Sequence, residues 1–182
     1  MTGIRLAVDE GADGALRDFA DAWGWETDES ASDAADPMLL SAWRSTREPA
    51  VIWYRAEPAL GLRVLVVAGE GAEGVASWVR LLVPSRARGD LSGLIGQLAD
   101  PPSWVNLMHL AAALGDPEEL DPELFLVVAN GLVHFDARVR EAAVLATGYL
   151  PWPQFRSALE RLAEADPDTQ VRACAAERLS AM

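Results

Sequence analysis

Few side chains in this sequence could bind a metal ion or act as a nucleophile. The histidines are His109 and His134, and the single cysteine is Cys174. His134 and Asp136 form a His-x-Asp pair, but a metal site would need a further ligand from elsewhere in the chain. We expect His134 to be a turn residue beside an N-cap aspartate. We expect His109 and Cys174 to pack within helices as structural side chains.

A glycine-rich segment at residues 69–74 superficially suggests a phosphate-binding loop. It reads Gly-Glu-Gly-Ala-Glu-Gly and follows an apolar run, but it contains no lysine. Its two carboxylates, Glu70 and Glu73, would repel phosphate. We therefore expect a hairpin turn here. The sequence as a whole predicts no catalytic residue, no metal site and no cofactor, so we expect a protein that is not an enzyme.

Charge and composition narrow the possible partners. The chain has 182 residues, of which 51% are hydrophobic, and its 15 basic and 28 acidic residues give a net charge of −13. This excess of negative charge repels a phosphate backbone, so we expect no nucleic-acid partner. No apolar run approaches the ~20 residues that span a bilayer, and no secretion signal is recognised. We expect a cytoplasmic protein with no membrane association.

The first part of the chain, residues 1–85, has the pattern of a small α/β module. Apolar spacing predicts a helix from Leu16 to Trp23, a loop over 26–37 and a short helix over 38–43. β-Branched and aromatic runs predict strands. The expected strands are 4–8, 51–54, 62–67 and 75–83, although the last also fits a helical spacing. These elements predict a small antiparallel sheet with a covering helix.

The second part, residues 86–182, has helical periodicity throughout. We expect Pro101 and Pro102 to break one helix and Ser103 to cap the next. Asp121, followed by proline, should open another helix. The expected helices are 90–98, 103–115, 122–133, 136–149, 152–165 and 168–180. The fold class is therefore α+β, and the α/β module should cap the helices in one fused unit.

A repeat of 32 residues links the last helices. The segment from Asp136 to Ala143 and the segment from Asp168 to Ala175 both read Asp-x-x-Val-Arg-x-x-Ala. Aspartate caps the helix start, while valine and alanine face the core. The arginine on the first turn can reach an acidic residue of an adjacent turn or repeat. This pattern predicts stacked helix pairs.

The repeat resembles HEAT repeats, in particular the short HEAT-like repeats of the phycobilisome-lyase type. The resemblance covers residues 120–182 and is weaker over 86–119, where Asn106 and His109 replace the arginine and the alanine. It does not cover residues 1–85. It implies a stack of helical hairpins whose exposed ridge binds partner proteins.

We therefore expect a non-enzymatic module for protein–protein interaction, with an acidic surface that suits a basic partner. The alternatives are an immunity or antitoxin-type protein that neutralises a basic partner, or a lyase-like protein that binds a small molecule. Exposed arginine and tryptophan are frequent interface anchors. The candidate partner-binding residues are Arg138, Arg140, Trp152, Arg172 and Trp25. The partner and the oligomeric state stay open.

Overall fold

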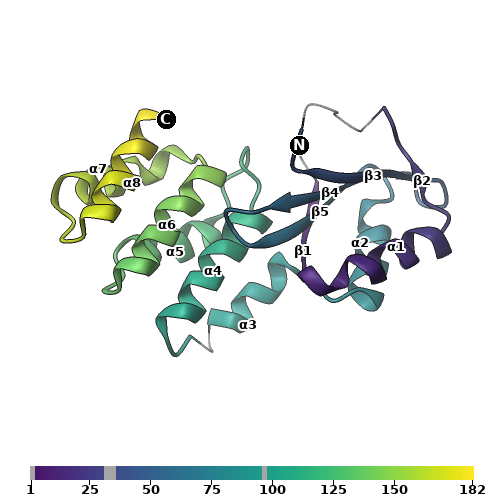
Figure 1. Ribbon diagram of the computed structural model, residues 1–182, viewed down its shortest axis with the longest axis horizontal. Helices are drawn as coiled ribbons and strands as arrows, with labels where there is room; N and C mark the ends of the chain where they lie inside the picture. The colour runs from purple at the N-terminus through teal and green to yellow at the C-terminus, as the bar shows by residue number, and fades with distance from the viewer. Residues whose placement is uncertain (1–2, 31–35, 96–97) are drawn as a thin grey trace. The chain divides into compact units, whose positions relative to one another are not determined.

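The computed structural model describes residues 3–30, 36–95 and 98–182 (Figure 1). The chain divides into two compact units, Met1–Arg88 and Gly89–Met182. An antiparallel sheet lies in the first unit and the second is helical, which confirms the expected α+β class. That the two units act as one fused body stays a prediction.

The sheet of the first unit has six described strands in the order β2-β3-β4-β5-β1-β6, and every neighbouring pair is antiparallel. The strands are β1 (Ile4–Val8), β2 (Glu26–Thr27), β3 (Leu39–Ser45), β4 (Ala50–Glu57), β5 (Leu62–Ala68) and β6 (Ser85–Ala87). β4 buries every second residue, as a strand with one face in a core must. The strands expected over 4–8, 51–54 and 62–67 are therefore confirmed.

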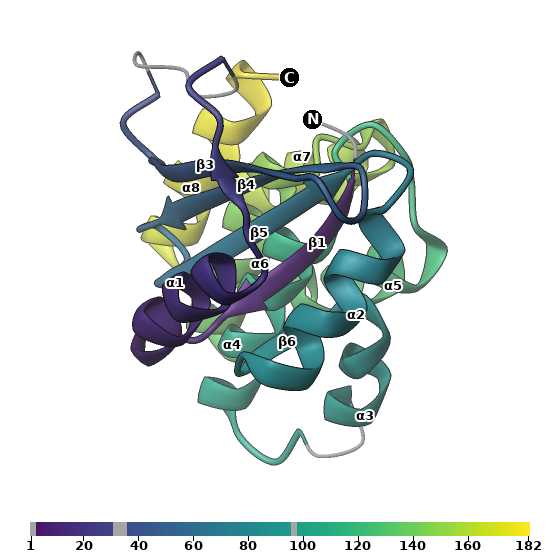
Figure 2. The ribbon, with the colours of Figure 1, turned by 90° about the vertical axis from the view of Figure 1, so that its right-hand side faces the viewer.

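Helices α1 (Asp13–Ala22) and α2 (Ala72–Leu82) cover one face of this sheet (Figure 2). α1 buries Leu16, Phe19 and Ala20, which is the stripe that the apolar spacing predicts. Trp25, just beyond α1, is 8% exposed and packs edge-on against Phe19, with 5.2 Å between ring centroids. Aromatic packing thus extends this core past the end of the helix.

The structure contradicts two of the expected elements: one expected helix is a strand, and one expected strand is a helix. The short helix expected over 38–43 is strand β3, because Trp43 pairs with Ile52 in the sheet and Ala42 with Trp53. The strand expected over 75–83 is helix α2, which buries Val75, Ala76 and Val79 at helical spacing. The expected loop over 26–37 contains the two residues of β2, and residues 31–35 lie outside the described part.

The glycine-rich segment is not a hairpin turn but the connection between β5 and α2. Its glycines are explained by close contact with the turn before β4. A Cβ on Gly69 would lie 2.7 Å from the carbonyl oxygen of Pro49, and one on Gly71 would lie 2.6 Å from the carbonyl carbon of Glu48. The Glu48 carboxylate lies against Gly74 in the first turn of α2. The Glu48 carboxylate thus fills the space beside Gly74, and its Oε2 is buried without a hydrogen-bond partner among the described residues.

The described part of the second unit contains α3 (Leu91–Ile95), α4 (Pro101–Leu114), α5 (Pro122–Leu132), α6 (Ala137–Tyr149), α7 (Arg156–Ala165) and α8 (Thr169–Ser180). The helix starts are fixed by local hydrogen bonds. The Asp136 carboxylate accepts from the backbone N–H of Arg138, and the Asp168 carboxylate from those of Gln170 and Val171. These caps confirm the expected starts of α6 and α8.

The start of α4 differs from the expectation. Asp100, not Ser103, is its N-cap, and the Asp100 carboxylate accepts from the backbone N–H of Ser103 at 2.9 Å. Pro101 and Pro102 open the helix instead of breaking it. Proline suits these positions because the first N–H groups of a helix have no intrahelical partner.

Candidate functional site

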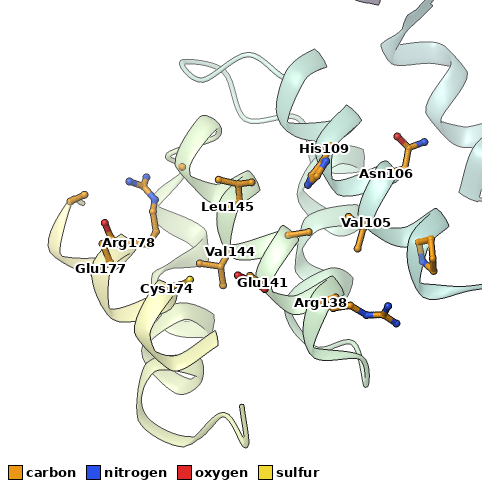
Figure 3. Close-up of a pocket in the computed structure, with 14 residues that line it drawn as sticks. Val105, Asn106, His109, Arg138, Glu141, Val144, Leu145, Cys174, Glu177 and Arg178 are labelled. Carbon is orange, nitrogen blue, oxygen red and sulfur yellow. The ribbon is translucent and has the colours of Figure 1, made fainter. Parts of the chain in front are cut away.

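Three helices of the second unit, α4, α6 and α8, lie in one layer and form a groove (Figure 3). α6 packs against α4 on one side and α8 on the other, while α5 packs on α6 and α7 on α8. The groove has a volume of about 830 Å³. It is the candidate functional site.

The groove is lined by one face of each helix. Its wall runs from Pro102 to His109 on α4 and from Arg138 to Gly148 on α6, and it includes Cys174 and Arg178 on α8. On each helix these residues follow a spacing of three and four, which places them on a single face. Most of the groove residues are exposed or half-buried, whereas Ala142 and Val144 are buried at its base.

The floor of the groove is largely apolar. Val105 of α4 and Leu145 of α6 contribute aliphatic side chains, and both are half-buried. Gly148 leaves a space beside them, because a Cβ built on it meets no other atom within 4 Å. Alanine would be favoured here by helix propensity and would fit. The fold itself therefore does not require glycine at this position of the groove.

Two arginines line the groove, and each has a contact within the chain. Arg138 donates from Nε and Nη2 to the Asp136 carboxylate, at 3.0 and 2.7 Å. This side chain is 67% exposed, and its guanidinium holds the pKa of Asp136 down to about 2. Arg178 donates from Nε to the carbonyl oxygen of Thr147 at 3.1 Å, and burial lowers the pKa of its guanidinium.

Cys174 lies in the groove between two carboxylates. Burial raises the pKa of its thiol, and the charges of Glu141 on α6 and Glu177 on α8 raise it further. Figure 3 shows Cys174 beside Glu141, with Glu177 further along α8 towards Arg178. A raised pKa keeps the sulfur as a thiol at neutral pH, so this site does not activate Cys174 as a nucleophile.

Arg140, the first repeat arginine, is not in the groove but is buried between the two helix pairs. Its Nε and Nη2 donate to the Asp166 carboxylate at 2.7 and 2.8 Å. Its Nη1 donates to the backbone carbonyl oxygens of His134 and Phe135 at 2.8 and 2.9 Å. The ion pair lowers the pKa of Asp166 and raises that of Arg140. The expectation that this arginine reaches an acidic residue of the next repeat is confirmed.

The second copy of the repeat makes a matching contact. Arg172 lies 32 residues after Arg140, and its Nη1 donates to the carbonyl oxygen of Asp166 at 2.5 Å. Asp166 in turn lies 32 residues after His134, so both arginines donate to the carbonyl six residues earlier. The repeat in sequence is therefore also a repeat in hydrogen bonding.

The candidate partner-binding residues fall into two groups. Arg138 is exposed in the groove and Arg172 is half-buried on α8, and partner binding by these two stays a prediction. Arg140, Trp25 and Trp152 are 7%, 8% and 3% exposed. Their burial contradicts a direct contact with a partner, because their surfaces already pack against the chain itself.

The burial of Trp152 has a physical reason. The indole N–H of Trp152 donates to the carbonyl oxygen of Asp116 at 3.2 Å, and its ring stacks on Phe155. Trp78 is 41% exposed on α2 and contacts Trp23 at 4.9 Å between ring centroids. A buried indole needs an acceptor for its N–H, and Trp152 has one in the Asp116 carbonyl.

The histidines have separate environments. His134 lies at the turn before α6, as expected, where its ring contacts Trp104 and Phe135 and its Nδ1 accepts from the backbone N–H of Asp136 at 3.1 Å. His109 lines the groove on α4. Among the residues that the structure describes, no group of histidine, cysteine and carboxylate side chains could hold a metal ion.

Sequence reasoning missed the groove carboxylates, Glu141 and Glu177. The signal was present, because Glu141 lies three residues after Arg138 and Glu177 lies three after Cys174, which places each pair on one helix face. What the sequence did not provide was the packing order of the helices, which brings these faces together.

Within the described ranges, no helix is both long and apolar enough to cross a membrane. Comparison of the chain with protein families, with curated proteins and with solved structures gives no match.

Proposed function

We propose that the helical unit is a HEAT-like interaction module that holds a segment of a partner protein in the groove of α4, α6 and α8. The 32-residue repeat supports the HEAT-like assignment, since Arg140 and Arg172 donate to equivalent carbonyl groups. Stacked helix pairs of this kind present one helical face as a continuous binding surface.

The observation that carries this proposal is the groove itself. It combines a volume of about 830 Å³ with an apolar floor and polar groups along both sides. A protein segment could bury its apolar side chains on Val105 and Leu145 while its polar groups meet the arginines and carboxylates. The raised pKa of Cys174 argues against covalent catalysis at this site. We further propose that the protein has no enzymatic activity and acts in the cytoplasm.

A phage-displayed library of random linear peptides tests this proposal on the full chain. We expect peptides that bind the wild type and shift the backbone NMR signals of groove residues such as Val105 and Leu145. Gly148→Leu should abolish this binding, because the new side chain fills the space beside the floor. The matched control is Gly14→Leu in α1, where a Cβ also meets no atom within 4 Å.

The peptide experiment can support or overturn the proposed binding of protein segments in the groove. Peptides lost in Gly148→Leu but kept in Gly14→Leu support a groove that binds protein segments. If no peptide binds the groove, or if Gly148→Leu leaves all binding intact, the proposal is wrong. Circular dichroism of both variants checks that each has folded.

A small-molecule ligand is the second candidate, and the volume of the groove favours it. Pockets for drug-sized ligands measure roughly 300–1,000 Å³, and this groove lies within that range. A thermal shift screen of small apolar acids and bases tests this candidate. A ligand that stabilises the wild type but not Gly148→Leu would support it over peptide binding.

A further inference from the structure

Two carboxylates in the groove have no partner within the described part of the chain. Glu141 on α6 is half-buried and Glu177 on α8 is exposed, and neither side chain makes a hydrogen bond or an ion pair there. Both act on the same atom, because the charge of each raises the pKa of the Cys174 thiol. They lie on two different helices, on either side of Cys174 in the groove lining (Figure 3).

Neither arginine of the groove forms an ion pair with these two carboxylates. Arg138 places one edge of its guanidinium, Nε and Nη2, on the carboxylate of Asp136, the N-cap of its own helix. Arg178 has its Nε on the backbone carbonyl of Thr147. The groove thus presents two carboxylates near Cys174 that have no ion-pair partner in the described part of the chain, next to an apolar floor.

A cationic side chain is the group that complements this arrangement. A lysine or arginine has a long aliphatic stem that can lie on apolar surface while its charged end stays at the rim. Its charge would be attracted by two carboxylates at once, and partial exclusion of water strengthens such an attraction over that of an exposed pair. An acidic side chain would be repelled at the same point.

From this charge complementarity we propose that the partner segment is basic, with a lysine or arginine side chain between Glu141 and Glu177 and an aliphatic side chain beside it on Leu145. This inference rests on the proposed function. The aliphatic neighbour fits because Leu145 lies four residues after Glu141, one turn further along the same face of α6. The space beside Gly148 accommodates its branches.

The test uses peptides selected on the wild-type full chain, with affinities from isothermal titration calorimetry. We expect lysine or arginine next to an aliphatic residue in the selected sequences. The double variant Glu141→Gln and Glu177→Gln should weaken binding by about tenfold or more. The matched control is Glu160→Gln with Glu164→Gln. These two substitutions lie at exposed positions on α7 and change the net charge of the protein by the same amount as the groove double variant. We expect the control to change affinity less than about twofold.

A second measurement does not depend on the protein variants. Replacing the peptide lysine by norleucine keeps the aliphatic stem and removes the charge. We expect this peptide to bind the wild type and the groove double variant with the same weak affinity. Without the lysine charge, the peptide has no attraction to Glu141 and Glu177 that the double variant could remove.

The possible results separate this inference from the proposed function. Selected peptides rich in aspartate or glutamate, whose binding is lost in Arg178→Gln but not in the glutamate variant, would overturn the basic partner and leave the groove as a binding site. If the wild type and the groove double variant bind the selected peptides with equal affinity, the basic partner is likewise overturned and the groove remains as a binding site. The absence of any groove-dependent peptide would overturn both proposals.

Discussion

Arg140 and Asp166 form a two-pronged ion pair across 26 residues, with N–O distances of 2.7 and 2.8 Å. Both side chains are nearly excluded from solvent, at 9% and 2% exposure. The pair joins the start of α6 to the turn that leads into α8. Because Nη1 of Arg140 also holds the carbonyls of His134 and Phe135, one guanidinium organises two successive turns.

Loss of Arg140 should therefore be costly. We expect Arg140→Ala to lower the free energy of unfolding by ~3–5 kcal/mol, because it leaves the Asp166 carboxylate buried without a partner. The measurement is urea denaturation followed by circular dichroism. Arg138→Ala is the control, since its ion pair with Asp136 is exposed and should contribute at most ~1 kcal/mol.

A double-mutant cycle sharpens this comparison. Arg140→Ala combined with Asp166→Asn should cost less than the sum of the two single changes, because the second substitution removes the unpaired charge. Additive costs, or equal effects of Arg140→Ala and Arg138→Ala, would contradict the central role of the pair.

The charge of Asp136 should make stability depend on pH in the acid range. Its pKa is lowered from 3.8 to about 2 in the folded chain, mainly by the hydrogen bond from Arg138. A depressed folded pKa contributes stability that is complete above the unfolded value and is lost as the pH falls from about 4 through about 2. The pKa of Asp166 is also lowered, so its contribution changes in the same direction.

Asp136→Asn isolates this contribution, because asparagine also caps helices well. Unfolding measured between pH 7 and pH 2 should show a smaller acid loss in this variant than in the wild type. Asp168→Asn is the matched control. Asp168 caps α8 as Asp136 caps α6, but the residue two positions after it is Gln170, where α6 has Arg138. An identical acid dependence of the wild type and Asp136→Asn would be inconsistent with the ion pair to Arg138.

Two helical glycines should respond to alanine in opposite ways. At Gly131 in α5 a Cβ would lie 2.5 Å from Sδ of Met108 and 2.9 Å from Cβ of Ala143, so Gly131→Ala should destabilise by ~1–3 kcal/mol. At Gly148 a Cβ meets nothing, and Gly148→Ala should stabilise by up to ~1 kcal/mol. Thermal unfolding of both variants checks this, and effects of the same sign would refute the packing argument.

The thiol of Cys174 reports the electrostatics of the groove. Its raised pKa predicts slow reaction with DTNB at neutral pH compared with free cysteine. The double variant Glu141→Gln and Glu177→Gln should react faster, because the removal of two nearby negative charges lowers the pKa. Glu160→Gln with Glu164→Gln should react at the wild-type rate. If the groove variant reacts no faster, the two carboxylates do not act on the thiol.

Local hydrogen bonding explains which parts of the fold could be predicted. The starts of α5, α6 and α8 each depend on an aspartate that accepts from an N–H two or three residues later. Such bonds lie within one turn and are visible in the sequence. The motif also indicated that a repeat arginine reaches an acidic residue of an adjacent turn or repeat, although the Arg140–Asp166 pair spans 26 residues and depends on the stacking of the helices.

Strand pairing and burial could not be predicted in the same way. Residues 75–83 fit both a strand and a helix, and the packing of Val75 and Val79 into the core beside the sheet decides for the helix. β3 exists because β4 pairs with it, a contact between separate segments. Trp152 is buried because the Asp116 carbonyl, distant in sequence, accepts its indole N–H.

The sequence by itself determined the starts of α5, α6 and α8, the 32-residue repeat and the α+β class, because these depend on local caps and periodic apolar faces. Only the tertiary structure decided that Arg140 is enclosed while Glu141 and Glu177 remain in an open groove. Adjacent residues on α6 have opposite environments, since a helix turns by about 100° per residue and its neighbours cover only some of its faces. Which faces are covered depends on the helices packed against them, and a single segment of sequence does not contain that information.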